Sequence, residues 1–371
     1  MTAGSRDGLG LAFVLWRGAI GGAETYVASL AAVMRGSGID ARVVLLEYAA
    51  PLDERLRRDG IPFSALGFAR GRDALRHPRR FAAEVRRSGP DGVVLQASGF
   101  LAPALRLGGY RGRIVAVEHG SVLQTRPEHR RSRAIERVDR LLGTAFVDRH
   151  VVVSDYVREH VGGRPVTIPN GVDLDLYRPA TPSRPGDGPF VVGCVSRLIA
   201  GKGVEDVLAA SRPVLDRGGR LRIAGDGPER TRLERLAAEL GIGPAVTFEG
   251  WLGGASEIVA FWHGCDVAIA APNDWVESFG LGAVEAMACG LPVVATRVGG
   301  LAETVVPGRT GALAAPRDTE ALSAALVAYM DDPELVATHG ASARARCEER
   351  YDIRRCAAQY ADLFRDGASP G

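Results

Sequence analysis

Apolar residues gather in short β-branched runs, and between these runs apolar positions recur at helical spacing. Continuous apolar runs indicate strands buried on both faces, and helices between them indicate crossovers in a parallel sheet. The pattern occurs twice along the chain and predicts two doubly wound α/β domains. We expect strands at residues 9–15, 42–46, 92–95, 113–117, 150–153, 190–195, 221–224, 246–249, 267–270 and 292–295, and helices at 24–35, 76–87, 130–142 and 353–365.

A segment rich in proline and glycine separates the two halves. Residues 178–189 contain four prolines and two glycines and lack hydrophobic periodicity, which is typical of a linker. We therefore predict an N-terminal domain at 1–178, a linker at 179–189, a C-terminal domain at 190–350, and a last helical stretch at 351–371 that crosses back to the first domain. Ligands of such sheets bind at the carboxyl ends of the strands, so two facing sheets predict one central cleft.

Charge is distributed unevenly although the net charge of the 371 residues is only +2. Residues 1–180 hold 27 arginines against 19 acidic residues, whereas residues 181–371 hold 19 basic against 25 acidic residues. The arginine-rich stretches at 70–87 and 126–140 either face an anionic lipid or an acidic carrier protein, or merely solvate helix surfaces. Both interpretations stay open, and nothing in the pattern indicates nucleic acid as a partner.

The five cysteines are scattered and form no C-x-x-C pair, which favours neither a disulfide framework nor a zinc site. The N-terminus lacks the layout of a signal peptide, and no apolar run approaches the ~20 residues of a membrane helix. We expect a cytoplasmic protein, with peripheral contact at the inner membrane face as an open alternative.

The stretch from Glu277 to Glu285 is the most informative in the chain. It runs Glu-Ser-Phe-Gly-Leu-Gly-Ala-Val-Glu and places one carboxylate before a glycine-rich helix start and the other in the first turns of that helix. A helix N-terminus binds anions because its first N–H groups lack partners and its dipole end is positive. Glycines at 280 and 282 favour close approach of a bulky anion. The two carboxylates are then placed to accept hydrogen bonds from hydroxyl groups on either side of a phosphate, one set from a sugar and the other from a ribose.

Lys202 is the only lysine among 46 basic residues. It follows the strand at 190–195 in the sequence Ser196-Arg197-Leu-Ile-Ala-Gly-Lys202-Gly. An ammonium five residues from a guanidinium suits a diphosphate, although a solvated surface lysine is the alternative. The position between a strand and a helix start favours the phosphate.

Weaker motifs follow other predicted strands. Gly21-Gly22 forms either a phosphate turn or a plain turn, and His119 either contacts a ligand hydroxyl or is an ordinary loop histidine. Gly225 and Trp251 end two further strands and either border a nucleotide base or belong to the scaffold. The D-x-D pattern at 173–175 has no strand before it at the spacing that a metal site needs. It is interpreted as a turn and helix cap, so we predict no metal site.

In their order and spacing these motifs resemble the retaining glycosyltransferases of family 4, which have the two-Rossmann GT-B fold. The resemblance covers nearly the whole chain and rests on Ser196-Arg197 with Lys202, on Ala224-Gly-Asp-Gly-Pro228, and on Gly299-Gly300 with Glu303, beside the pair of glutamates. The loop between Arg197 and Lys202 departs from the family by lacking a polar residue before the lysine, which puts the loop shape in doubt.

The resemblance implies a nucleotide-sugar donor held mainly by the second domain. It implies that Arg197 and Lys202 bind the diphosphate and that Glu285 binds the ribose diol. It also implies that Glu277 and the N–H groups of Phe279, Gly280 and Leu281 bind the transferred sugar and phosphate. It further implies that Gly22, beside Gly21, lets the first domain close on the diphosphate and that His119 contacts the donor sugar.

The predicted function is transfer of a hexose-type sugar, with retention and without a metal or other cofactor, from a uridine diphosphate sugar. The acceptor is a small molecule or is linked to a lipid or a carrier protein, in cell-envelope glycan or secondary-metabolite biosynthesis. A non-catalytic nucleotide-sugar-binding subunit and a sugar-nucleotide epimerase of the same fold are the alternatives.

Overall fold

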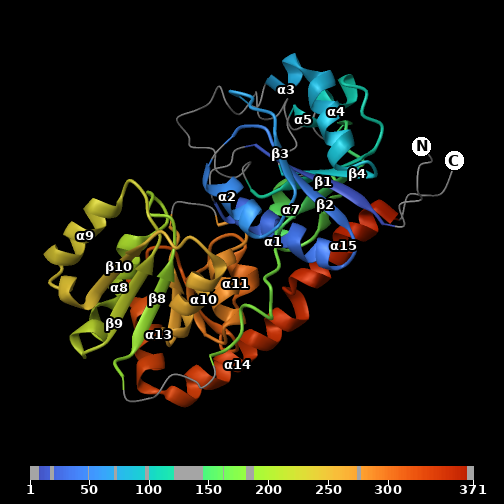
Figure 1. Ribbon diagram of the computed structural model, residues 1–371. Coiled ribbons are helices and arrows are strands. Elements are labelled where there is room, and N and C mark those ends of the chain that lie inside the picture. Colours follow the sequence, from blue (N-terminus) through green and yellow to red (C-terminus); the bar gives the residue numbers. More distant parts are fainter. Residues whose placement is uncertain are drawn as a thin grey trace. The chain divides into compact units, whose positions relative to one another are not determined.

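The computed structural model describes most of the chain, namely residues 8–16, 21–48, 50–70, 73–96, 100–120, 145–161, 163–180, 188–273 and 277–365. The chain divides into two compact units. One unit holds Met1–Gly171 together with Ile353–Gly371, and the other holds Val172–Asp352. Each unit is a parallel sheet with helices on both faces, and each is described by itself (Figure 1). The predicted domain limits remain a proposal beside these units.

Seven strands among the described residues form the sheet of the first unit, in the order β3-β2-β1-β4-β5-β6-β7, and every pairing is parallel. The order reverses between β1 and β4, because the chain builds outward from β1 on one side and later returns to its other side. Such a reversal is a topological switch point, where ligands of open α/β sheets bind. The strands are β1 Gly10–Leu15, β2 Asp40–Leu45, β3 Phe63–Ala65, β4 Gly92–Leu95, β5 Arg113–Glu118, β6 Arg149–Val152 and β7 Val166–Thr167.

Helices cover both faces of this sheet, because successive strand residues point to opposite sides. On β1, Ala12 and Val14 join a buried cluster with Phe81 of α4 and Leu105 of α5, while α1 packs on the opposite side of β1 and β2. The helices are α1 Gly22–Gly36, α2 Ala50–Arg58, α3 Asp73–Arg76, α4 Pro78–Ser88, α5 Leu101–Leu107, α7 Asp155–Val161 and α15 Ile353–Arg365.

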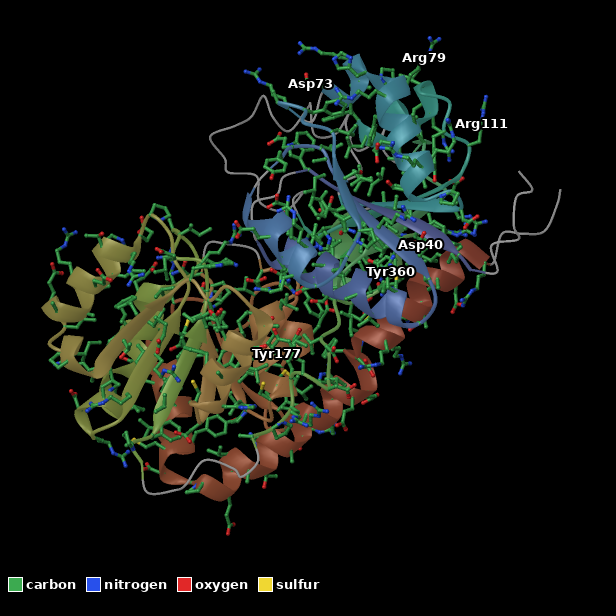
Figure 2. All side chains as sticks on the ribbon, viewed as in Figure 1. Asp40, Asp73, Arg79, Arg111, Tyr177 and Tyr360 are labelled. Atoms are coloured by element: carbon green, nitrogen blue, oxygen red, sulfur yellow. The ribbon has the colours of Figure 1, made fainter. Side chains whose placement is uncertain are left out.

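The last helix, α15, completes the core of the first unit. It contacts α1, and the ring of Phe364 lies so close to Gly92 of β4 that a Cβ on that glycine would come within 2.2 Å of the ring. The guanidinium of Arg113 donates a hydrogen bond to the carbonyl of Leu363. The buried face of α15 includes Tyr360, labelled in Figure 2. The final helix is therefore an integral part of this unit.

The described strands of the second unit follow the same plan, in the order β10-β9-β8-β11-β12-β13, again with parallel pairing throughout. Here the switch point lies between β8 and β11. The strands are β8 Val191–Val195, β9 Arg220–Ala224, β10 Val246–Gly250, β11 Val267–Ala270, β12 Val293–Thr296 and β13 Gly311–Ala314. The helices are α8 Val204–Asp216, α9 Arg230–Glu239, α10 Ala255–His263, α11 Leu281–Ala288, α12 Leu301–Thr304, α13 Thr319–Asp331 and α14 Pro333–Arg350, with a 3₁₀ turn at Gly243–Ala245.

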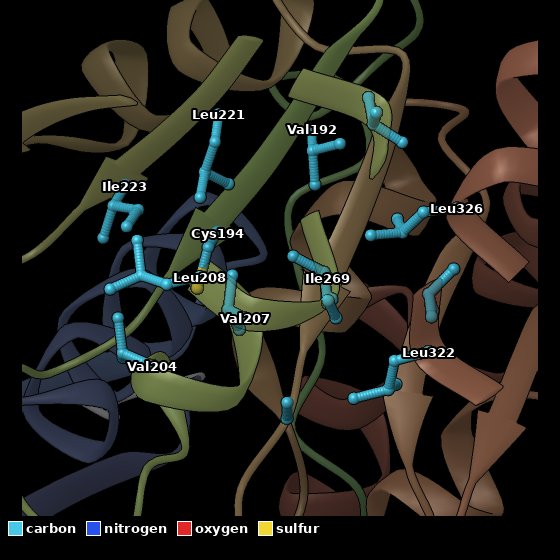
Figure 3. Close-up of a cluster of buried hydrophobic side chains, with 14 of the residues drawn as sticks. Val192, Cys194, Val204, Val207, Leu208, Leu221, Ile223, Ile269, Leu322 and Leu326 are labelled. Atoms are coloured by element: carbon cyan, nitrogen blue, oxygen red, sulfur yellow. The ribbon is translucent and has the colours of Figure 1, made fainter. Parts of the chain in front are cut away.

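The core of the second unit lies between one face of the sheet and helices α8, α9 and α13. Val192, Leu221 and Ile269 of the strands meet Leu208 of α8 and Leu322 of α13, all at most 2% exposed (Figure 3). Burying each such side chain contributes about 1.5–3 kcal/mol. This packing fixes the strand ends from which the loops of the next section extend.

The predicted fold class is confirmed as two parallel α/β sheets covered by helices. The ten predicted strands are all present, two of them with the predicted bounds and the others with ends shifted by one or two residues. Three short strands, β3, β7 and β13, were not predicted, because two to four residues with mixed burial give no clear apolar run. The predicted helix at 130–142 lies outside the described residues.

The predicted helix at 76–87 is wrong in one respect, since two helices meet there. α3 ends at Arg76 and α4 starts at Pro78. A proline disfavours the helical conformation of the residue before it, here His77, but suits the first position of a new helix. The proline therefore sets the break.

No helix in the described ranges combines the length and the apolar composition that crossing a bilayer requires.

Candidate functional site

Four loops of the second unit meet at the carboxyl ends of neighbouring strands. The loop after β8 is tied to the loop after β9, where Leu198 N–H donates to Asp226 O over 2.9 Å. It is also tied to the segment after β11, where Asn273 N–H donates to Gly201 O over 3.0 Å. Gly300 N–H, after β12, donates to Glu277 O over 2.7 Å. Backbone contacts thus fix the loops on both sides of the β8/β11 switch point.

Lys202 and Glu277 face each other across this switch point. The Nζ atom of Lys202 lies 2.6 Å from Oε2 of Glu277, and the two side chains are 11% and 25% exposed. An ion pair that is largely removed from water is less screened than a surface pair. The two charges that sequence analysis placed on different loops are therefore brought together, 75 residues apart in the chain.

The loop after β8 depends on Gly203 for its close packing. Gly203 has a φ of 66° and caps α8, and a Cβ there would lie 1.7 Å from the carbonyl oxygen of Ala271. Any side chain would push the loop away from the end of β11. Gly203 therefore allows the loop after β8 to pack closely against the end of β11.

The carboxylate of Glu277 also lies at the N-terminus of α11. Gly280, the N-cap residue with a φ of 89°, donates its N–H to Oε1 of Glu277 over 3.3 Å. Leu281 opens the helix, and Phe279 is 5% exposed with its ring edge-to-face on Tyr351 at 5.6 Å. A carboxylate at this helix start is stabilised by the helix dipole. In this structure the carboxylate of Glu277 itself therefore occupies the predicted anion site.

The glycines near α11 also pack for reasons other than ligand approach. A Cβ on Gly280 would lie 2.5 Å from Leu301, and one on Gly282 would lie 3.4 Å from the carbonyl oxygen of Val195. Gly280 therefore lets Leu301 pack against the start of α11, whereas a Cβ on Gly282 would make only an ordinary contact with the end of β8.

Arg197 and Glu285 occupy different surroundings. Arg197 lies on the same loop as Lys202 and is exposed. Glu285 lies in the second turn of α11, is only 5% exposed, and accepts a hydrogen bond from the hydroxyl of Tyr177 over 3.1 Å at Oε1. The structure thus places one predicted cation at the surface and one predicted carboxylate within the fold.

Gly225 and Trp251 lie at the next two strand ends. Gly225 N–H donates to the carbonyl of Gly250 over 2.7 Å, which ties the loop after β9 to the end of β10. Trp251 follows directly and is 46% exposed. An exposed aromatic ring beside the hydrogen-bonded ends of β9 and β10 is suited to stacking on a planar ligand.

In the first unit, His119 and Gln96 follow the neighbouring strands β5 and β4. The Nε2 atom of His119 lies 2.6 Å from Oε1 of Gln96. Because an amide oxygen only accepts, this nitrogen carries the proton and leaves Nδ1 as the acceptor. Burial lowers the pKa of His119 to about 4, so the ring is neutral near pH 7.

Two further features shape this end of the first unit. Glu118 is buried, and its Oε1 accepts the N–H of Gly120 over 2.7 Å, which folds the turn around His119. Gly21 is the extended N-cap residue of α1 and Gly22 is the first residue of that helix. The preceding residues, 17–20, lie outside the described ranges.

The aspartates at 173 and 175 form a turn, as predicted. Oδ1 of Asp173 accepts the N–H of Asp175 over 3.1 Å. Across the described ranges, no group of three or more histidine, cysteine or acidic side chains is placed to hold a metal ion.

Comparison with known proteins decides the family. The model for "Glycosyl transferases group 1" matches residues 181–346, and the model for "Glycosyltransferase Family 4" matches residues 20–176. Together these matches span most of both units. The chain belongs to the family 4 glycosyltransferases. The resemblance to family 4 that the motifs indicated is thereby confirmed.

Curated relatives match over part of their length. A glycogen synthase of Mycobacterium tuberculosis is 37% identical over 200 residues, which are 53% of this chain and 47% of that protein. A GDP-mannose-dependent α-(1-6)-phosphatidylinositol monomannoside mannosyltransferase of Mycolicibacterium smegmatis is 35% identical over 214 residues, covering 53% of this chain and 55% of that protein. The matches thus span about half the length of these relatives.

Solved structures show the same fold. Anabaena HepE in complex with UDP-glucose has a TM-score of 0.80 at 24% identity, over 96% of this chain and 100% of that one. Sucrose-phosphate synthase from Thermosynechococcus elongatus has a TM-score of 0.78 at 23% identity, over 96% and 98% of the chains. The fold of this family 4 member is therefore GT-B.

Sequence reasoning missed two residues that contact predicted site residues. Gln96 has no motif of its own, and only its position directly after a predicted strand at 92–95 pointed to the strand-end loops. Tyr177 lies four residues after Asp173, in a segment interpreted as a plain turn. No sequence signal linked either residue to its partner, because each contact joins distant parts of the chain.

Proposed function

We propose that this chain is a metal-independent, retaining glycosyltransferase that moves a hexose-type sugar from a uridine diphosphate sugar to an acceptor hydroxyl. The observation that carries the proposal is the Lys202–Glu277 pair at the β8/β11 switch point, beside the N-terminus of α11. A cation, a helix start and a carboxylate at one place suit a diphosphate with a sugar attached to it.

Departure of the nucleoside diphosphate develops negative charge on its terminal phosphate. Lys202, Arg197 and the N–H groups at Phe279, Gly280 and Leu281 would stabilise that charge, because their dipoles and charges are already oriented before the reaction. The sugar–phosphate C–O bond breaks, and the acceptor oxygen bonds to the anomeric carbon on the same face. The departing phosphate takes the acceptor's proton.

Glu277 has a second role in this proposal. Its carboxylate accepts a hydrogen bond from the N–H of Gly280 and pairs with the ammonium of Lys202. These are the two groups that the proposal assigns to the phosphate. A bound diphosphate would compete for both groups, and the carboxylate would then accept hydroxyls of the transferred sugar. The exchange keeps Lys202 beside an anion in both states.

Further residues complete the donor assignment. Glu285 accepts the ribose diol, while Trp251 and the Gly225 turn border the base. From the first unit, the proposal assigns His119 to a hydroxyl of the donor sugar and Gly21 and Gly22 to the diphosphate. A neutral histidine with a fixed tautomer suits a sugar hydroxyl better than a phosphate.

The relatives bear on donor and acceptor. HepE was solved with UDP-glucose, whereas the mycobacterial mannosyltransferase is GDP-mannose-dependent and acts on a phosphatidylinositol mannoside. We propose a uridine donor and an acceptor in cell-envelope glycan or secondary-metabolite biosynthesis. Exposed arginines of α3 and α4, among them Arg76 and Arg79, provide a surface for a lipid-linked or carrier-linked acceptor at a membrane face.

Thermal-shift screening against UDP-, GDP- and ADP-sugars tests the donor. We expect UDP-sugars to raise the melting temperature most, with or without EDTA. Slow release of nucleotide from the donor in the absence of acceptor then separates an enzyme from a non-catalytic binding subunit. Binding without any release would contradict the catalytic proposal, and stabilisation by GDP-sugars alone would contradict the uridine donor.

A further inference from the structure

The carboxylate of Glu285 is almost completely buried from solvent. Its side chain lies on α11, a helix whose residues from 283 to 288 are all buried, and it is 5% exposed. A buried carboxylate is costly unless hydrogen-bond donors face it. The hydroxyl of Tyr177 is one such donor, at 3.1 Å from Oε1, and comes from a segment 108 residues earlier in the chain.

Tyr177 is itself held firmly. Its side chain is 5% exposed, and its N–H donates to the carbonyl of Asp173 over 2.8 Å. Figure 2 labels its position in the second unit. The ring is therefore packed and the backbone is closed into a turn, so the hydroxyl has little freedom to leave the carboxylate.

A single guanidinium joins the Tyr177 turn to the helix that carries Glu285. The Nη1 atom of Arg344, on α14, donates to Tyr177 O over 2.6 Å and to Ala288 O over 2.8 Å. Ala288 is the last residue of α11. The tyrosine and the glutamate are thus fixed relative to each other by their own contact and by a shared donor at the end of the helix.

Packing explains the ring of Tyr177 but not its hydroxyl. A phenylalanine would fill the same space, whereas a buried hydroxyl needs a partner of its own. Its partner is the carboxylate assigned to the ribose, and a hydrogen bond to a carboxylate is stronger than one between neutral groups. The hydroxyl therefore sets the direction in which the carboxylate points.

We propose that Tyr177 is a positioning residue that orients the Glu285 carboxylate for the ribose diol and so gives the protein its preference for ribonucleotides. The inference rests on the proposed function, because it takes the ribose role of Glu285 as given. Tyr177 does not touch the nucleotide; it acts through Glu285.

The test is the Tyr177→Phe variant of the full chain, measured by calorimetry with UDP and with 2′-deoxy-UDP. If the donor screen selects another base, the matching ribose and deoxyribose diphosphates replace this pair. We expect UDP affinity to fall about tenfold, the loss of one hydrogen bond to a charged group. Affinity for 2′-deoxy-UDP should change little, so the preference for the ribonucleotide shrinks.

Two controls separate positioning from general damage. Tyr329→Phe removes another buried hydroxyl of the same unit, which lies 2.7 Å from Nδ1 of His339, and should leave the ribose preference unchanged. Tyr177→Phe in a Glu285→Gln background should add little to the loss caused by Glu285→Gln alone, because the tyrosine acts through that carboxylate.

The outcomes distinguish the inference from the proposed function. A wild-type protein that binds UDP and 2′-deoxy-UDP equally well would remove the ribose role of Glu285 and this inference with it. A wild-type preference that Tyr177→Phe retains in full would overturn the role of Tyr177 alone. Equal weakening of both nucleotides by Tyr177→Phe would also overturn it, because that is the result of a purely structural role.

Discussion

The strand ends of the two units use different chemistry around similar switch points. In the second unit, a cation and an anion meet at the start of a helix, Lys202 against Glu277. In the first unit, a neutral pair follows β4 and β5, His119 against Gln96, and burial holds the pKa of the histidine at about 4. One fold thus carries a charged pair at the strand ends of one unit and a neutral pair at those of the other, and the proposed function assigns a phosphate to the first and hydroxyls to the second.

The difference indicates which unit would stabilise the charge that develops during the reaction. Charge develops on a leaving phosphate, so groups that stabilise it belong to the charged site. Hydroxyl recognition needs direction more than charge, and the fixed tautomer of His119 gives direction. Variants of the second unit should therefore impair turnover most, and variants of the first unit should act more weakly.

The largest effect is expected from Lys202→Ala. Removing the ammonium takes away charge stabilisation of the leaving group and leaves the Glu277 carboxylate without its cationic partner. We expect kcat to fall about 100- to 1,000-fold, measured as sugar transfer or, without acceptor, as nucleotide release. Lys202→Arg is the matched control, since it keeps the charge but changes its shape. Near-normal turnover of Lys202→Ala would remove the proposed role of this residue.

A smaller loss is expected from Glu277→Gln, which keeps the size of the side chain but removes its charge. The donor sugar loses a charged acceptor, and kcat/KM should fall about 10- to 100-fold. Glu249→Gln is the control, because it neutralises a surface carboxylate that pairs with Arg222 on β9, outside the proposed site. Equal activity of the two variants would contradict the assignment of Glu277.

Glu285→Ala should weaken nucleotide binding about tenfold, since the ribose diol loses its carboxylate acceptor. Calorimetry with UDP measures this directly, and a thermal melt of the variant checks that the fold persists. Unchanged nucleotide affinity would rule out the ribose contact and would make Glu285 a structural residue.

The last prediction concerns the stability of the protein, not its turnover, and how that stability depends on pH. The pKa of His119 is lowered from 6.5 to about 4, so the unfolded chain binds more protons between these values, and stability falls as pH drops from about 6.5 to about 4. Above that window the contribution is constant. His119→Gln should lose less stability than wild type across the same window, as followed by melting temperature. Parallel curves for the two proteins would show that His119 does not titrate in this way.

The sequence predicted the fold well because the signals it used are local. Buried parallel strands read as apolar runs, and the glycines and prolines that end them act within a few residues. The same local logic placed Lys202 after β8 and Glu277 before α11. It failed at Pro78, where one residue splits a helical pattern, and at β3, β7 and β13, which are too short to carry a period.

Contacts between distant residues could not be predicted in the same way. Hydrogen bonds from Tyr177 to Glu285 and from Gln96 to His119 depend on which strand ends become neighbours and on how each side chain packs. Neither tyrosine nor glutamine carries a motif, so only the folded chain identifies them.

The sequence by itself determined the alternation of strands and helices, the family, and the residue types available for phosphate and hydroxyl chemistry, because these follow from local pattern and composition. Tertiary structure alone decided that Lys202 pairs with Glu277 at the start of α11, that the His119 ring stays neutral, and that Tyr177 holds Glu285. The physical reason is that charge pairing, burial and hydrogen-bond direction depend on distances in space, which chain spacing does not specify.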